Sequence, residues 1–277
     1  MLIKIYELLT LEMPTPDSYG WFHIVCIASV IGLTILACMF GKNSTDKQVN
    51  RFLGAIWVLI LSLEIYKQLI FGFDVVDGRF VWDYSWYAFP FQFCSSPLYI
   101  LPVIVFTKNS KLRDACISYM VGFSFFAGLA VFCYPNDVFV STIGINIQTM
   151  IHHGSQILVG VFLAVRYKDK MTRSFYLSSI PVFAAMSGIA IILNSLVFKI
   201  FTLVGIDETF NMFYISPHFD CTLPVLSIVY KMVPYSVFLF IYIFGFALCA
   251  LIVFGILKGI TVSVKTKKAS CMQKAEA

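Results

Sequence analysis

Seven long apolar stretches, separated by short polar segments, constrain the fold of this chain more than any other feature. They cover roughly residues 19–40, 52–72, 88–107, 114–134, 144–166, 175–200 and 234–258. Each is close to the ~20 apolar residues that a helix needs to cross a bilayer. Charged residues make up only 13% of the 277 positions, against ~25% in soluble domains. The sequence therefore predicts an all-α polytopic membrane protein, a compact bundle of about seven transmembrane helices.

Lysine and arginine are distributed unevenly between the loops. The segments after the second, fourth and sixth stretches are nearly free of them, whereas the alternate loops and the C-terminal segment are cationic: Lys42, Lys47, Arg51, Lys108, Lys111, Arg113, Arg166, Lys168, Lys170, Arg173, Lys258, Lys265, Lys267, Lys268 and Lys274. Cationic loops stay in the cytoplasm. We therefore expect a multi-pass protein of the cell membrane, with the N-terminus outside and the C-terminus inside. One transmembrane domain covers residues 1–277, and residues 259–277 form a basic cytoplasmic tail.

The segments on the outer side carry four further signals. Residues 1–18 mix charges with two prolines, which is typical of a short interfacial segment and not of a cleavable signal peptide. The run from Leu223 to Val229 is apolar but too short to span, so it predicts an interfacial or re-entrant helix that could cover an outward-facing site. Cys133 and Cys221 both lie on this side, and a disulfide between them is one option. An aromatic belt is formed by Trp82, Tyr84, Trp86 and Tyr87.

Several polar side chains share one depth in the predicted membrane. With a helix rise of 1.5 Å per residue, Glu64, Cys94, the pair His152 and His153, and Asn194 lie roughly 9–14 Å below the outer surface. Ionisable groups are costly at this depth and mark functional sites. The same layer also holds Lys67, Gln68, Gln92, Gln148 and Gln156. We therefore expect a polar site in the outer third of the bundle.

Helical spacing refines this layer. Residues 148, 152 and 156 recur every fourth position, so Gln148, His152 and Gln156 share a face, and His153 points about 100° away. Glu64 has Lys67 and Gln68 within reach at i+3 and i+4. Pro97 cannot donate a hydrogen bond to the carbonyl of Phe93, so the third helix should kink beside Cys94. A carbonyl freed at membrane depth must face protein or a water-filled cavity, which favours a pocket there.

A thiol and two imidazoles suggest covalent acyl chemistry. Cys94 would be the nucleophile, and an imidazole would take and return its proton. Gln92, Gln148 or Asn194 could donate to a developing oxyanion, and Glu64 could orient an imidazole.

Other interpretations of these residues remain open. The histidines could simply join helices, and Glu64 with Lys67 could be a structural pair. Two histidines and a glutamate can bind zinc, but adjacent histidines on a helix diverge, so we expect no metal and no cofactor. A small-solute or ion transporter could use the same polar layer, and a homodimer is one assembly that such a small transporter could adopt. No basic patch with aromatics indicates nucleic acid.

At these positions the chain resembles the YwaF family of bacterial integral membrane proteins, related to human transmembrane protein 164. The matching pieces are Leu63-Glu64-Ile65, the stretch from Phe89 to Cys94, His153-Gly154, Asn194 and the stretch from Asn211 to Tyr214. The resemblance implies a compact seven-helix fold and a cysteine/histidine acyltransferase of phospholipids or lysophospholipids, with Cys94 as nucleophile and His153 as base; His152 is a rival for that role. Since the predicted site opens to the outer leaflet and acyl-CoA is cytosolic, we expect a transacylase with membrane lipids as substrates, or a hydrolase.

Overall fold

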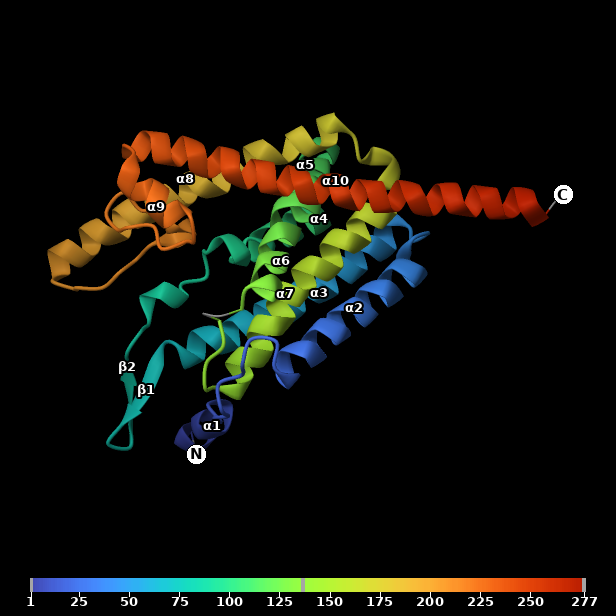
Figure 1. The fold of residues 1–277 in the computed structure, drawn as a ribbon. Helices are drawn as coiled ribbons and strands as arrows, with labels where there is room; N and C mark the ends of the chain where they lie inside the picture. Colours follow the sequence, from blue (N-terminus) through green and yellow to red (C-terminus); the bar gives the residue numbers. More distant parts are fainter. Residues whose placement is uncertain (1, 136–137, 276–277) are drawn as a thin grey trace.

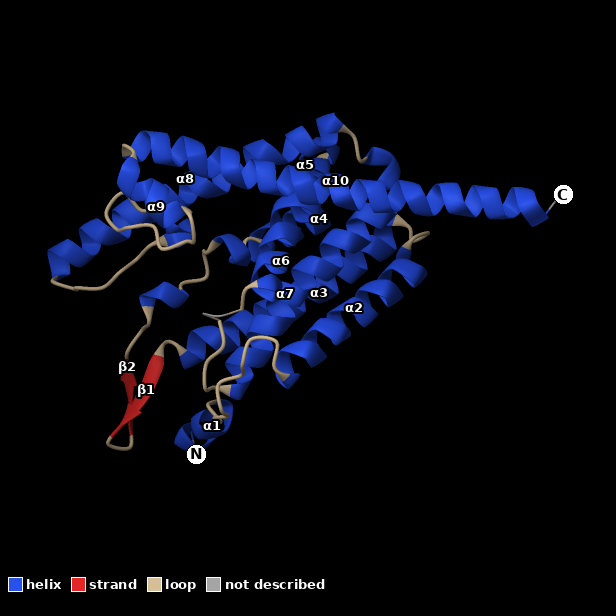
Figure 2. Ribbon diagram, viewed as in Figure 1, coloured by secondary structure: helices blue, strands red, loops and turns tan. Residues whose placement is uncertain are grey.

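The computed structural model describes the backbone of residues 2–135 and 138–275, and the side chains as far as Thr261 (Figure 1). Helices dominate the fold (Figure 2), which confirms the all-α membrane class. Among the described residues, five helical stretches are long and apolar enough to cross a bilayer: α2 (Trp21–Gly41), α3 (Asp46–Ile70), Ser110–Cys133, α8 (Arg173–Val204) and the Tyr235–Thr261 part of α10 (Tyr235–Ala275).

The fifth apolar stretch forms α7 (Ile143–Arg166), which is the central helix of the bundle. It packs against α2, α3 and α6, and most of its side chains are buried (Figure 1). It is long enough to cross a bilayer, but its polar residues make it less apolar than the five helical stretches named above. Because other helices surround α7, those polar side chains face protein.

The third apolar stretch differs most from its prediction. Instead of one helix with a kink, it contains the 3₁₀ turns η1 (Trp86–Ala88) and η2 (Phe93–Ser95), followed by α4 (Pro97–Phe106). The continuous part, Phe93–Phe106, would extend only about 21 Å at 1.5 Å per residue. Proline explains the break. Phe89, which precedes Pro90, has an extended ψ of 134°, and Pro97 takes the first helical turn, where its missing N–H is tolerated.

The fourth stretch is interrupted rather than straight. It consists of α5 (Ser110–Tyr119), the π-helical η3 (Met120–Ser124) and α6 (Phe125–Cys133). Past this bulge, α6 comes very close to α7 at Gly128. A Cβ atom at this glycine would lie 2.6 Å from the carbonyl oxygen of His153. Glycine is therefore what allows α6 to approach the backbone of α7 beside His153.

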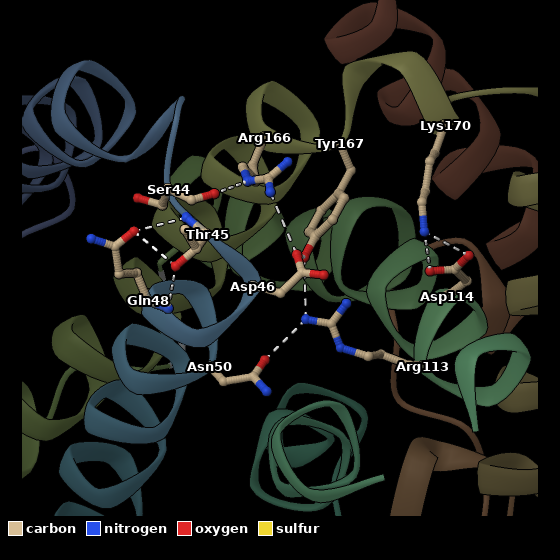
Figure 3. A network of polar contacts seen from close by, with 10 residues as sticks. All are labelled: Ser44, Thr45, Asp46, Gln48, Asn50, Arg113, Asp114, Arg166, Tyr167 and Lys170. Carbon is tan, nitrogen blue, oxygen red and sulfur yellow. Dashed lines mark hydrogen bonds and ion pairs between the residues drawn. The ribbon is translucent and has the colours of Figure 1, made fainter. Parts of the chain in front are cut away.

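The three cationic loops meet at one end of the bundle (Figure 3). The Tyr167 hydroxyl donates to Asp46, which begins α3, at 2.9 Å and accepts from Arg113 of α5 at 3.1 Å. Beside it, in η4 (Lys168–Lys170), Lys170 pairs with Asp114 at 2.8 Å. The α3 helix begins with a capping box between Thr45 and Gln48, which adds to this polar layer.

The opposite end carries a β-hairpin that the sequence analysis did not predict. Strands β1 (Phe73–Val76) and β2 (Arg79–Trp82) are joined by Asp77 and Gly78, whose φ angles of 50° and 71° suit a two-residue hairpin turn. The short helix α1 (Leu2–Leu9) lies beside it, because the Tyr6 hydroxyl donates to the Phe73 carbonyl.

A long loop links α8 to α10 at this same end. It contains η5 (Met212–Tyr214) and α9 (Leu226–Met232), so a helix does form close to the predicted Leu223–Val229 run. Cys133 and Cys221 are both free thiols, so the disulfide considered from the sequence is not formed.

Candidate functional site

Cys94 lies in the middle of η2, where a backbone carbonyl is left free by proline. In this tight turn the carbonyl of Cys94 would meet the N–H of the residue three positions on, and that residue is Pro97. Side chains of α7 take over instead: His152 Nε2 lies 2.9 Å and Gln156 Nε2 2.8 Å from the Cys94 carbonyl oxygen. A freed carbonyl was predicted at Phe93. The Phe93 carbonyl instead accepts from the N–H of Ser96 at 3.3 Å.

The two histidines have different surroundings. A carbonyl oxygen can only accept, so His152 carries its proton on Nε2, and its imidazole is bound to the Cys94 backbone. The shared face of His152 and Gln156 is thereby confirmed. His153 is 8% exposed and points elsewhere, with Nδ1 lying 2.8 Å from the carbonyl oxygen of Thr149. By the same reasoning Nδ1 is protonated, which leaves Nε2 of His153 with a lone pair that can accept a proton.

One cavity contains both Cys94 and His153. Its volume is about 550 Å³. Its walls come from α6, from α10 and from the long loop, and they are mainly apolar: Phe93, Phe126, Ala127, Ala130, Val131, Val138, Leu223, Pro224, Leu226, Gly245 and Phe246. The polar residues along it are Gln92, Tyr214, Tyr242 and the second thiol, Cys249. A mainly apolar lining with a few polar groups is typical of small-molecule binding sites.

Three amide side chains predicted to bind or orient a substrate form hydrogen bonds with the backbone of the long loop. Asn194 of α8 pairs with both the N–H and the carbonyl of Met212, at 2.7 and 3.0 Å. Gln92 accepts from the N–H of Phe213 at 3.0 Å and donates to the carbonyl of Asn211 at 3.2 Å. Asn211 in turn bonds the backbone of residues 216 and 220. We call Gln92, Asn194 and Asn211 the amide clamp.

Glu64 belongs to a separate group. Its Oε1 lies 2.9 Å from Lys67 Nζ and 2.7 Å from Gln68 Nε2, as the helical spacing predicted. It faces a different cavity, of about 510 Å³, beside Tyr84. Burial, and secondarily the Glu64 carboxylate, raise the pKa of Tyr84 to about 12, so its hydroxyl stays protonated and donates to Gln68. Glu64 is therefore bonded within its own helix, whereas the His153 imidazole is bonded to the Thr149 carbonyl.

Gln148 also lies apart from the Cys94 cavity, and its nearest polar partner is Thr149 Oγ1 at 3.4 Å. Within the described ranges, no three His, Cys, Asp or Glu side chains gather as metal ligands would. Of the polar layer predicted from the sequence, the structure brings together Cys94, both histidines and Gln156, with the amide clamp beside them.

A sequence model of the TMEM164 family matches residues 18–258. The chain belongs to this family. The match includes α2 to α8 and the membrane part of α10, and it confirms the resemblance to YwaF-like proteins. No curated protein and no solved structure matches the chain.

In this TMEM164-family protein, sequence reasoning missed several residues of the site, among them Thr149 and Tyr242. Thr149 acts through its carbonyl, which any residue type supplies, so only its position four residues before His153 could have indicated it. Tyr242 donates to the carbonyl of Phe213 at 2.9 Å. As one tyrosine within an apolar helix, it carried no signal that distinguished it from a core residue.

Proposed function

We propose that this protein is a membrane-embedded cysteine/histidine acyltransferase that moves acyl chains between phospholipids and lysophospholipids. The observation that carries the proposal is the single apolar cavity that contains Cys94 together with an imidazole whose tautomer is fixed for base catalysis. Cys94 is partly exposed in that cavity, so a ligand in it can reach the thiol.

The proposed placement is in the cell membrane, with seven crossings, the N-terminus outside and the C-terminus in the cytoplasm. The convergence of three cationic loops at one end of the bundle supports it, because cationic loops remain cytoplasmic (Figure 3). The short Phe93–Phe106 crossing is completed by the irregular segment before it. Such backbone is tolerated at membrane depth where protein surrounds it, as α7 does at Cys94.

In the first half-reaction, Sγ of Cys94 attacks the carbonyl carbon of a phospholipid ester while His153 Nε2 takes the thiol proton. A C–S bond forms, and the carbonyl π electrons move to oxygen. When the intermediate collapses, the ester C–O bond breaks and His153 returns the proton to the departing lysolipid oxygen. In the second half-reaction, the hydroxyl of a lysolipid attacks the thioester by the reverse sequence, and water in its place gives hydrolysis.

The local backbone supports both the thiolate and the oxyanion. Cys94 lies in the first turn of Phe93–Phe106, where the partial positive charge of a helix N-terminus stabilises an anion. Phe93 and Cys94 are the first two residues of η2, where backbone N–H groups have no partner within the helix. These N–H groups can donate to the carbonyl oxygen under attack.

The test is acylation of the purified protein in lipid nanodiscs by an alkyne-tagged long-chain acyl ester, with the thioester located by mass spectrometry. Cys94→Ala should abolish labelling, and His153→Ala should slow it by about 10²–10⁴-fold. Cys249→Ala is the matched control, since this thiol lines the same cavity and should leave the rate unchanged. Wild-type labelling that persists in Cys94→Ala would refute the nucleophile. An unlabelled wild type that instead moves solute across proteoliposomes would favour a transporter.

A further inference from the structure

Two consecutive aromatic residues adopt a left-handed backbone in the long loop. Phe213 has φ 59° and Tyr214 has φ 57°. Left-handed conformations are uncommon for residues with a side chain and persist only where the surroundings enforce them, often at functional sites. This pair therefore needs a physical explanation.

Polar side chains around this turn hold its backbone in the left-handed conformation. The Asn194 side chain bonds both the N–H and the carbonyl of Met212, and the N–H of Phe213 donates to the Gln92 side chain. The Phe213 carbonyl accepts from the Tyr242 hydroxyl at 2.9 Å. Four hydrogen bonds, three of them fully buried, thus hold a turn of two strained residues.

This turn sends its two side chains in different directions. Phe213 is fully buried and packs among the rings of Phe91, Phe93 and Phe183. Tyr214 instead lines the cavity that contains Cys94 and His153. Hydrophobic packing accounts for Phe213, and the left-handed conformation of Tyr214 places this residue along the cavity.

The same clamp fixes the turn relative to the nucleophile. Gln92 begins η2, two positions before Cys94, and its side chain bonds the backbone on both sides of Met212. The Cys94 turn and the Tyr214 turn therefore share one rigid connection. Preorganised donors of this kind are what an oxyanion requires, because they need no reorganisation when charge develops.

We propose that Tyr214 is a catalytic residue whose phenol donates a hydrogen bond to the oxyanion formed when Cys94 attacks an acyl carbonyl. This inference rests on the acyltransferase function proposed above. The phenol keeps its proton throughout: no bond to it is made or broken, and its hydrogen bond strengthens as charge moves from the thiolate to the carbonyl oxygen. Gln92 and Asn194 are then positioning residues that act through the turn.

The test compares two reactions of the same thiol. Acylation by the tagged ester passes through an oxyanion, whereas alkylation by iodoacetamide does not. In Tyr214→Phe, acylation of Cys94 should be about 10²–10³-fold slower, while alkylation should proceed at the wild-type rate. His153→Ala should slow both reactions. Tyr230→Phe, on α9 and outside the cavity lining, is the control and should slow neither.

Each remaining outcome is decisive. If Tyr214→Phe acylates at the wild-type rate, or loses both reactions equally, the phenol does not stabilise an oxyanion. Unchanged alkylation and an unchanged unfolding temperature would show that the variant has folded. If the wild type alkylates at Cys94 but never acylates, the proposed function fails and this inference fails with it.

Discussion

The close approach of α6 to α7 at Gly128, beside the candidate site, gives a sharp test of the packing. In Gly128→Ala, the new Cβ would lie 2.6 Å from the His153 carbonyl oxygen and 2.8 Å from the Gln156 Cβ, both well inside the ordinary contact distance of 3.4 Å. Both neighbours belong to the body of α7, so the two helices must separate. Overpacking of this kind costs about 1–3 kcal/mol.

Gly245→Ala is the matched control, because Gly245 lies in α10 along the same cavity and a Cβ there meets no atom within 4 Å. The gain in helix propensity, about 1 kcal/mol, is common to both variants and cancels between them. Gly128→Ala should therefore be about 1–3 kcal/mol less stable than Gly245→Ala.

The assay is thermal unfolding of both variants in the same detergent. At roughly 2–4 °C per kcal/mol for a chain of this size, Gly128→Ala should unfold roughly 2–12 °C below Gly245→Ala. It should also acylate more slowly, because a misplacement of about 1 Å can reduce a rate by 10²-fold, and its alanine displaces the backbone of His153. Equal unfolding temperatures would refute the close approach of α6 to α7.

Three further predictions concern buried polar contacts, each measured by thermal unfolding. Lys67→Met leaves the Glu64 carboxylate buried without its cation and should lower the free energy of unfolding by about 3–5 kcal/mol. The double variant with Glu64→Gln should recover most of that loss; a double variant as unstable as Lys67→Met would contradict the pairing. Tyr167→Phe removes the hydroxyl that joins an arginine and an aspartate in Figure 3, and about 1–3 kcal/mol should be lost, less in high salt. Asn194→Leu leaves the N–H and the carbonyl of Met212 without their side-chain partner. The variant should lose at least about 2 kcal/mol of stability and acylate more slowly. A stable, fully active variant would show that the clamp is dispensable.

The sequence predicted the fold class and the position of most helices, because runs of apolar residues report directly on burial in lipid. The prediction was wrong where prolines or turn-forming residues, and not the apolar composition, determine the local backbone. The third stretch is as apolar as the others, but Pro90 and Pro97 prevent a continuous helix. The hairpin at Asp77 and Gly78 carried a recognisable Asp-Gly turn signal between β-prone residues.

The sequence grouped the residues of the candidate site by their depth along the helices, but not by the direction in which each side chain points. Equal depth grouped Glu64 with Cys94 and the histidines, yet depth is one coordinate, and the angle around each helix decides which neighbour a side chain meets. His152 and His153 illustrate the difference: adjacent in sequence, one binds the Cys94 backbone and the other faces the cavity. The neighbour that each ring meets depends on where η2 and α6 lie against α7. That packing is set by a proline that frees a carbonyl and by the small volume of Gly128, and neither is visible in the periodicity of α7 itself.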